Sequence, residues 1–408
     1  MVEARRVPFS RPGGHSRGSN QTGVRLYNER LVLSLIRKHE ALPKAGLARL
    51  THLSPQTISI IVNQLEADGL LARRPPQRGK VGQPLTPYAL HPRGAYFMGL
   101  KIGRRASDVV LLDFAGTVIG RIHSPHPFPT PDSVVALARR GIDELAGQLD
   151  AAGRRRVAGF GIASPFELWN WESQFAAPRD VLDAWKRTDV AHEIGAISPW
   201  PVYFHNDGTA ACAAELVLGQ EPRAEEFLYI FVGSFIGGGV VLDGHLFPGR
   251  TRYAGAIGPL PVPTGTGGYQ QLLKNASIYV LAEALAAEGR DPSVLWRDPD
   301  DWGDLGVVLE NWIAEAARAI ALACVSAASI IDFSQFVIDG AFPRRVQSEL
   351  VARVSSEIER FDLQGLPPFS VLAGTVGSAA REIGGACLPL LASFTPDREV
   401  LFKDAGSA

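Results

Sequence analysis

Four polar side chains near residue 60 are of types that can read the base edges of DNA. They are Gln56, Thr57, Ser59 and Asn63, whose amide and hydroxyl groups can donate and accept hydrogen bonds in the major groove. Ser54 can cap a helix and Pro55 suits its first turn. Apolar residues then recur at the spacing of one helical face, at Ile58, Ile61, Val62 and Leu65. The pattern predicts a helix that presents its polar face to DNA, with a solvated surface helix as the alternative.

Two more helices and a basic turn are expected around this helix. Apolar spacing predicts one helix from Tyr27 and a short one over residues 43–50. A strand with Arg73 and Arg74 should follow residue 69 and lead to a glycine-rich tip. The tip carries Arg78 and Lys80, which can contact phosphates or the minor groove. We therefore expect residues 25–92 to form a winged helix-turn-helix domain that binds double-stranded DNA.

Charge is distributed unevenly along the chain. The 408 residues include 41 Lys and Arg and 42 Asp and Glu, a formal net charge of −1. Residues 1–80 alone hold 14 basic and 5 acidic residues, a net charge of +9, which leaves −10 for the rest. A basic region on an acidic body indicates that the first part meets a polyanion. Residues 1–24 are expected to be a disordered basic arm, which either follows a DNA backbone or has no specific role.

The composition excludes several classes of protein. With 46% hydrophobic and 20% charged residues, the chain is not disordered throughout. Its three cysteines, Cys212, Cys324 and Cys387, are too far apart to indicate a disulfide framework or a structural zinc site. The longest apolar stretch, residues 319–331, is too short to span a bilayer, and no secretory signal is present. We expect a cytoplasmic protein with no membrane partner.

From about residue 96, strand-like and helical segments alternate in two series. The first predicts strands over 97–102, 109–113 and 117–122, a helix over 133–149, and strands over 157–163 and 202–204. The second predicts a strand over 227–232, a hairpin with a glycine hinge at 237–239, a strand over 240–242, helices near 270–288 and 304–330, and a strand over 336–338. Two α/β lobes with mixed sheets and a cleft between them are expected.

Three motifs in these lobes, in this order, resemble the ROK family of bacterial sugar-responsive repressors and sugar kinases. They are Gly-Ile-Ala-Ser-Pro at 161–165, Asn-Asp-Gly-Thr-Ala-Ala at 206–211 and Ile-Gly-Gly-Gly at 236–239. The resemblance covers about residues 25–400. It implies an α/β fold: an N-terminal winged helix-turn-helix followed by a two-lobed, actin-like or sugar-kinase-like (ribonuclease H-like) ATPase-type fold. The first lobe would span 93–206 and be completed by a C-terminal helix near 378–400, and the second would span 207–377.

The resemblance also implies a binding site for a sugar-like molecule in the interlobe cleft. Asn206 and Asp207 match a family pair in which the Asp contacts a sugar hydroxyl and, in kinases, is the general base. The residues alone leave another interpretation open, in which Asn206 and Asp207 cap the next helix and the glycines make tight turns. The ligand-binding residues implied are Ser164, Pro165, Asn206, Asp207, Gly238 and Gln271.

Several departures from the family's motifs argue against kinase activity. The D-x-G-G-T turn that holds phosphates in kinases is replaced here by residues 101–106, with Arg104 and Arg105 in the turn. A second glycine cluster is reduced to Asp-Gly-Ala at 339–341. The segments that supply a Glu, a His and cysteine ligands for zinc in sugar-binding members are replaced by residues 255–259 and 264–271, which carry none of these side chains. We therefore expect no catalytic residue, no metal and no cofactor.

The sequence thus predicts a DNA-binding transcriptional regulator of the repressor type. It should be a homodimer or a dimer of dimers, because twofold symmetry is usual for proteins that read paired DNA half-sites. A sugar-like effector in the cleft would change the spacing of the two DNA-binding domains. Two alternatives stay open: a ROK-type sugar kinase with an added DNA-binding domain, and a dimeric DNA-binding regulator that responds to no ligand.

Overall fold

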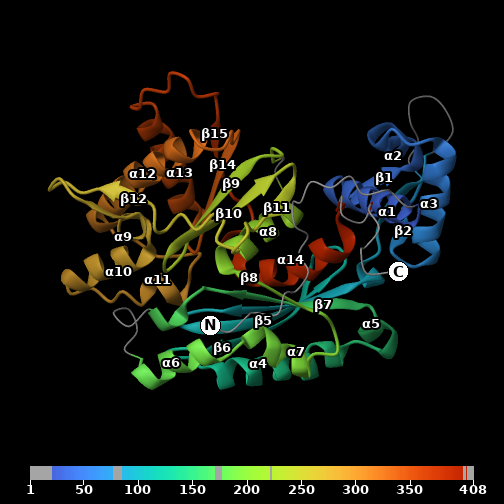
Figure 1. The fold of residues 1–408 in the computed structure, drawn as a ribbon, viewed down its shortest axis with the longest axis horizontal. Helices are drawn as coiled ribbons and strands as arrows, with labels where there is room; N and C mark the ends of the chain where they lie inside the picture. The colour runs from blue at the N-terminus through green and yellow to red at the C-terminus, as the bar shows by residue number, and fades with distance from the viewer. Residues whose placement is uncertain (1–20, 77–84, 171–176, 221–222, 398–400, 402–408) are drawn as a thin grey trace.

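The computed structural model describes residues 21–76, 85–170, 177–220, 223–397 and 401, and it shows a small head beside a body of two lobes (Figure 1). Most of the expected N-terminal arm lies outside these residues, as does the expected basic tip with Arg78 and Lys80. A single turn of 3-10 helix, η1 (Pro92–Gly94), leads from the head into the first strand of the body.

The head contains three helices and a three-stranded antiparallel sheet of order β1-β3-β2. Its elements are α1 (Gln21–Lys38), β1 (Ala41–Pro43), α2 (Lys44–Thr51), α3 (Pro55–Ala67), β2 (Leu71–Arg73) and β3 (Pro87–Leu90). The first helix begins at Gln21 rather than Tyr27, and the other two lie where apolar spacing predicts them. Ile36, Leu47 and Ile58, one from each helix, are fully buried. This is the winged helix-turn-helix that the sequence predicts.

The first lobe has a five-stranded mixed sheet of order β6-β5-β4-β7-β8. Its elements are β4 (Tyr96–Ile102), β5 (Ala106–Asp113), β6 (Val118–Pro125), α4 (Pro131–Glu144), η2 (Ala146–Gln148), α5 (Ala151–Arg155), β7 (Val157–Ser164), η3 (Leu168–Asn170), α6 (Arg179–Arg187), α7 (Val190–Ile197) and β8 (Val202–Asn206). Strands β4, β5 and β6 are antiparallel, and β7 and β8 join in parallel. The five strands appear in the predicted order, and the helix expected over 133–149 ends at Glu144 and is followed by η2.

The second lobe repeats this topology with a sheet of order β11-β10-β9-β14-β15. Its elements are α8 (Asp207–Leu218), β9 (Phe227–Val232), β10 (Ile236–Leu242), β11 (His245–Phe247), β12 (Pro261–Pro263), β13 (Tyr269–Gln271), α9 (Leu273–Ala276), α10 (Ile278–Ala287), α11 (Val294–Arg297), α12 (Val307–Ala328), β14 (Gln335–Gly340), α13 (Arg344–Ile358), β15 (Ser370–Ala373) and η4 (Gly377–Ala379). Its strands are again antiparallel in the first three and parallel in the last two. The helix that follows η4, α14 (Ala380–Phe394), returns to pack on β4 and β7 of the first lobe.

Two expectations for the second lobe are wrong. The glycines at 237–239 are not a hinge, because they lie inside β10 and pair with β9, and the turn of the hairpin lies at 233–235. A Cβ atom on Gly238 would collide with the carbonyl oxygen of Tyr229, so close packing of the backbone requires glycine there. The single helix expected near 270–288 is divided into β13, α9 and α10, since the backbone is extended at Ser277.

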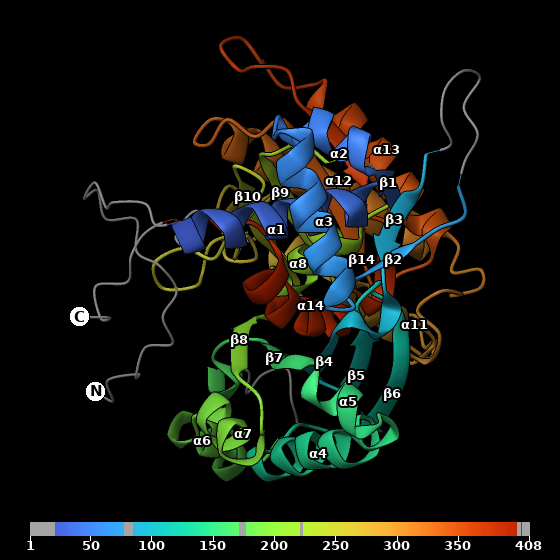
Figure 2. The same cartoon turned by 90° about the vertical axis from the view of Figure 1, so that its right-hand side faces the viewer.

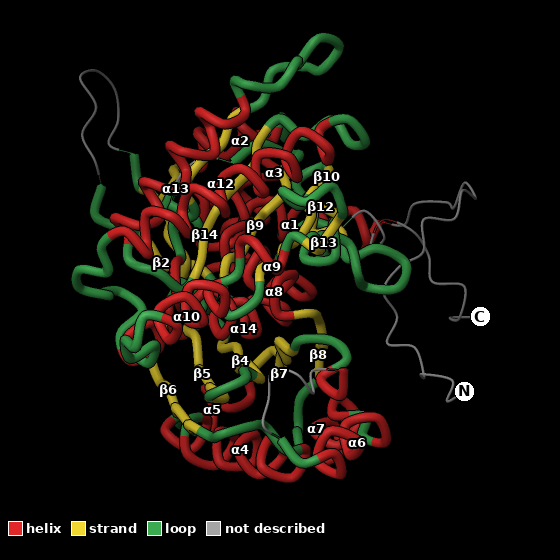
Figure 3. Tube along the Cα trace, turned by 90° about the vertical axis from the view of Figure 1, so that its left-hand side faces the viewer, coloured by secondary structure: helices red, strands yellow, loops and turns green. Residues whose placement is uncertain are grey.

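Helices α8 and α14 form the layer between the two sheets (Figures 1 and 3). Helix α14 lies so close to the first sheet that a Cβ atom on Gly161 of β7 would collide with the carbonyl oxygen of Gly385. On its other side, a Cβ atom on Gly384 would collide with the carbonyl oxygen of Ala210 in α8. Glycine therefore allows α14 to pack between the lobes. Among the described residues, none of the helices is long and apolar enough to cross a membrane.

Candidate nucleic-acid interface and interlobe cleft

Helix α3 lies on the outside of the head, with its N-terminal turn built as the sequence predicts (Figure 2). The hydroxyl oxygen of Ser54 accepts a hydrogen bond from the backbone amide of Thr57 at 3.1 Å, and it lies 2.8 Å from the Thr57 hydroxyl. The Thr57 side chain therefore faces the helix cap. Gln56 and Asn63 are exposed on the outer face, where they can reach a partner.

A lysine of the neighbouring helix contacts two of the predicted DNA-reading residues. Lys44 Nζ donates hydrogen bonds to Ser59 Oγ at 3.1 Å and to Asn63 Oδ1 at 2.7 Å. The bond to Oδ1 leaves the NH₂ group of Asn63 to donate elsewhere. Lys44 stands at the start of α2. No sequence pattern marks it as part of this surface, because only the packing of α2 against α3 brings it close to Ser59 and Asn63.

The two arginines around the end of β2 have different surroundings. Arg73 donates two hydrogen bonds to the carboxylate of Glu66, at 2.6 and 2.9 Å, so its charge is balanced within the head. The Arg74 side chain is exposed, and its backbone amide donates to the carbonyl oxygen of Pro87 at 2.8 Å. Of the two, Arg74 is better placed to contact a phosphate.

Arg156, at the end of α5 in the first lobe, bonds the head to the body. Its guanidinium donates to the carbonyl oxygens of Asp68 and Gly94, both at 2.9 Å. Asp68 is the C-terminal cap of α3. At another point of the joint, Arg30 of α1 donates to the carbonyl oxygen of Thr395 at 3.4 Å, just after α14. Helix α3 is therefore hydrogen-bonded to the first lobe.

Apolar packing is continuous through this joint. The Phe114 ring lies 4.8 Å from the ring of Phe394 in α14, and the Arg37 guanidinium lies 5.3 Å from the centre of the Phe114 ring. Burial lowers the pKa of Arg37 to about 10, so it stays charged at neutral pH. One cluster of buried side chains extends from Ile58 in α3 to Phe231 in the second lobe. The head and the body thus share a hydrophobic core.

The structure brings five of the six predicted ligand-binding residues to one edge of the cleft. Ser164 and Asn206 end the neighbouring parallel strands β7 and β8 and are register partners. Pro165 and Asp207 follow them in the chain, and Gly208 lies so close to the backbone of Gly238 in β10 that a Cβ atom on Gly208 would collide with it. The sixth residue, Gln271, lies instead on the exposed strand β13, paired with Pro261.

Asn206 and Asp207 already have partners within the protein. Asn206 is the N-cap of α8, and its side-chain oxygen accepts the backbone amide of Gly208 at 3.0 Å. Asp207 Oδ1 accepts the same amide at 3.0 Å, and Oδ2 accepts a hydrogen bond from Arg381 Nη1 at 3.3 Å. The helix-capping role is therefore present. The Asp207 carboxylate, which would meet a ligand, is paired with Arg381 of α14. No pattern in the sequence pointed to this ion pair.

The turn between β4 and β5 contacts the second lobe through its arginines. The Arg104 guanidinium lies 3.5 Å from the centre of the Phe235 ring, and that of Arg105 lies 4.2 Å from the centre of the Trp296 ring. Burial lowers the pKa of both arginines, and the charge of Asp207 opposes this shift at Arg104. A cation over an aromatic face is attracted by the ring quadrupole. This turn therefore links the two lobes.

A second set of contacts links the lobes near His205. The Tyr253 ring of the second lobe lies 4.8 Å from the Phe166 ring, and its hydroxyl donates to Glu167 Oε1 at 3.3 Å. His205 is buried in β8 beneath this region. Burial, and then the positive charge of Arg252, lower the pKa of His205 to about 4, so its imidazole is neutral at physiological pH.

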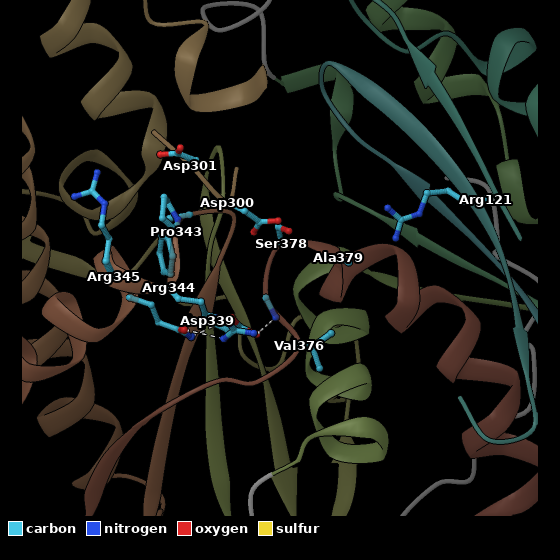
Figure 4. A pocket seen from close by; sticks show the side chains of 13 residues that line it. Arg121, Asp300, Asp301, Asp339, Pro343, Arg344, Arg345, Val376, Ser378 and Ala379 are labelled. Carbon is cyan, nitrogen blue, oxygen red and sulfur yellow. Dashed lines mark hydrogen bonds between the residues drawn. The ribbon is translucent and has the colours of Figure 1, made fainter. Parts of the chain in front are cut away.

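A cavity of about 720 Å³ opens between the lobes and is lined in part by the η4 turn (Figure 4). Arg121 of β6 faces it from the first lobe and forms an ion pair with Glu382 at 2.5 Å. On the second-lobe side, the Asp339 carboxylate accepts the backbone amide of Gly377 at 2.8 Å, and Arg344 donates to the carbonyl oxygen of Gly374 at 2.7 Å. The Asp339 carboxylate and the Arg344 guanidinium on this wall are thus bonded to the protein itself. The predicted ligand-binding residues do not line this cavity.

Two family models match parts of the chain. Residues 97–273 match the model of the ROK family, and residues 27–80 match a model of the MarR family. The uncharacterized protein y4fQ of Sinorhizobium fredii is 25% identical over 377 residues, which cover 90% of this chain and 91% of that protein.

Two further comparisons are with a named repressor and a solved structure. The xylose repressor of Bacillus subtilis is 22% identical over 248 residues, which cover 60% of this chain and 62% of the repressor, so the match spans less than two thirds of its length. A crystal structure of a ROK family transcriptional regulator, described as a homolog of the Escherichia coli MLC protein, is 19% identical, with a TM-score of 0.62. That match covers 93% of this chain and 99% of the solved chain.

Proposed function

Because the chain joins a MarR-type winged-helix domain to a ROK family domain, we propose that it is a transcriptional regulator that binds operator DNA and responds to a sugar-like molecule. It acts as a repressor and binds its operator as a dimer, so that two copies of α3 meet two half-sites. Gln56, Ser59 and Asn63 read bases, while Arg74, Arg78 and Lys80 contact the phosphate backbone. Relatives named xylose repressor and N-acetylglucosamine repressor support this proposal.

The bond from Arg156 to the end of α3 is the observation that carries the proposal. A regulator must convert a change in its ligand-binding part into a change in the placement of its DNA-reading part. Here the reading helix is bonded to the first lobe at 2.9 Å. A ligand that moves the first lobe against the second would therefore also move α3.

The β4–β5 turn supports a regulator without kinase activity. Phosphoryl transfer depends on backbone amides and a metal ion that position the phosphates. In this turn the side chains of Arg104 and Arg105 are stacked on Phe235 and Trp296 of the second lobe instead. A nucleotide that entered here would have to displace both stacks. Arginine can bind phosphate, but this loop holds neither the carboxylate nor the second glycine of the kinase motif.

The effector is proposed to bind where β7 and β8 end, between Ser164, Asn206, Asp207 and Gly238. Asp207 and Asn206 supply acceptors and donors for vicinal hydroxyl groups. A ligand there would compete with Arg381 for the Asp207 carboxylate, which gives it a way to alter α14. Because α14 ends beside α1, this change would reach the head by a second route. Gln271 enters this site only if the β12–β13 hairpin moves.

The DNA-binding part of the proposal is tested with the full-length protein and duplexes enriched from a random-sequence pool. We expect specific binding that weakens steeply as the salt concentration rises, because phosphate contacts release counterions. Fluorescence anisotropy over a salt series measures this dependence. A protein that binds no duplex at low ionic strength would contradict the proposal.

The effector and the alternatives are tested by a thermal-unfolding screen of neutral sugars, sugar acids and amino sugars. An effector that binds the folded state must raise the unfolding midpoint, and it should also change the affinity for the enriched duplex. A protein that binds DNA but responds to no compound would support the ligand-independent regulator. Turnover of ATP in the presence of any of these sugars would support the kinase.

A further inference from the structure

Ile60 lies in the middle of the exposed face of α3, among the residues proposed to read DNA. Its side chain is 62% exposed, although it is fully apolar. Gln56 lies four residues before it and Asn63 three residues after it, so the three side chains project from one side of the helix. The buried side chains of Ile58 and Ile61 point the opposite way, into the head. The centre of the proposed reading face therefore carries a branched apolar group.

The chemistry of the major groove restricts what such a group can meet. Base edges there present hydrogen-bond donors and acceptors, and the one apolar group among them is the C5-methyl of thymine. Packed against the amino group of cytosine or the oxygen of guanine, Ile60 would bury a polar atom without a partner, which lowers affinity. Packed against a methyl group, it removes apolar surface from water on both sides.

We propose that Ile60 contacts the C5-methyl group of a thymine and thereby selects thymine at one position in each half-site. The inference rests on the proposed DNA-binding function and names a base that this function leaves open. The DNA-reading residues predicted from the sequence do not include Ile60, because a hydrogen-bonding side chain points to base recognition and an apolar one does not.

The surroundings of Ile60 fix its position on the helix surface. Lys44 Nζ donates to Ser59, next to Ile60 in the chain, and to Asn63, one helical turn further on. These bonds join α3 to α2 on the reading side of the head. The side chain of Ile60 is β-branched and has few rotamers in a helix, so little conformational freedom is lost on contact. Lys44, Gln56 and Asn63 provide polar contacts to DNA, and these position the helix so that Ile60 can make its apolar contact.

Replacing single thymines with deoxyuridine tests this contact. Deoxyuridine lacks the methyl group and keeps every hydrogen-bonding group of thymine. The full-length protein first enriches duplexes from a random-sequence pool, and each thymine of the enriched site is then replaced in turn. We expect one position in each half-site to lose affinity about fourfold, the effect of one buried methyl group. At that position, a 5-methylcytosine·guanine pair should bind more tightly than a cytosine·guanine pair by a similar factor.

The variant Ile60→Ala assigns the effect to this side chain. It should bind the thymine and deoxyuridine duplexes equally, while its unfolding midpoint stays that of the wild type because the position is exposed. Ile330→Ala is the matched control, since Ile330 is an isoleucine of the body that is 82% exposed, and it should keep the full difference. If no thymine is sensitive, or if Ile60→Ala keeps the sensitivity, the inference is overturned alone. If the wild type enriches no duplex, the proposed function is overturned as well.

Discussion

The exposed face of α3 and the interlobe cleft place their polar side chains in opposite environments. On α3, Gln56 and Asn63 are exposed and can be replaced without disturbing a core. In the cleft, Asp207 is paired with Arg381 and Arg104 is stacked on Phe235, so each polar group is part of the packing between the lobes. Substitution of an exposed side chain on α3 should therefore change DNA binding more than stability, whereas substitution of a paired side chain in the cleft should first change stability.

The largest change in stability is expected from Gly384→Ala, at the crossing of α14 and α8 between the lobes. The added methyl group would meet the backbone of Ala210, which cannot move without separating the two helices. We expect the free energy of unfolding to fall by about 3 kcal/mol or more, measured by denaturant unfolding. Gly195→Ala in α7 is the control, because no atom lies within 4 Å of its added Cβ, and it should be neutral or stabilising. An unchanged midpoint for Gly384→Ala would disprove the tight crossing.

Acidification should destabilise the cleft through His205. The pKa of His205 is about 4 in the folded protein and about 6.5 for an ordinary histidine, so the unfolded state binds more protons between these values. Stability from this group is therefore complete above pH 6.5 and is lost as the pH falls towards 4, by up to about 3 kcal/mol. The difference in unfolding free energy between the wild type and His205→Gln should shrink over this range. A difference that does not change with pH would show that the folded protein leaves the pKa of His205 at its ordinary value.

The stack of Arg104 on Phe235 should contribute a smaller amount to lobe packing. A double-mutant cycle with Arg104→Gln and Phe235→Leu isolates the pair from other effects of each change. We expect a coupling of about 1 to 2 kcal/mol in unfolding free energy, as for a partly desolvated cation–π pair. Additive effects of the two substitutions would mean that the stack of Arg104 on Phe235 does not link the lobes.

The smallest change in stability is expected from the basic residues of the head. Arg74→Ala should leave unfolding within about 0.5 kcal/mol of the wild type, while lowering the slope of log affinity against log salt by about one unit. Arg78→Ala and Lys80→Ala are expected to lower the slope similarly. Arg73→Ala should lower it less, because Glu66 already balances its charge. Equal slopes for Arg73→Ala and Arg74→Ala would remove this distinction between the two arginines.

The sequence predicts those parts of the molecule that depend on local periodicity. The helix cap at Ser54 and the buried stripe of α3 follow from residues next to each other in the chain. Ser164 and Asn206 were expected in one site because of the family resemblance, and the structure shows them as register partners at the ends of neighbouring parallel strands. A short segment and a general rule were enough for the helix, whereas the site needed the resemblance.

The parts that could not be predicted are contacts between distant segments. Lys44 with Asn63, Arg156 with Asp68, and Arg381 with Asp207 join residues 19, 88 and 174 positions apart. No periodicity marks such partners, because they are set by how finished elements pack. The glycines at 237–239 were misplaced for the same reason, since a strand that needs glycine for close packing has the same composition as a turn.

Because the head and the body share a core, the head cannot be moved unchanged into a chimeric sensor. Cut at the 3-10 turn, the head would lose Phe114 and Phe394 from its underside, and the guanidinium of Arg37 would lose the ring beneath it. A transplant must therefore carry β5 and the end of α14 with it, or rebuild their apolar surface on the new host. The head therefore depends on apolar surface that this body supplies, and it cannot be transferred alone.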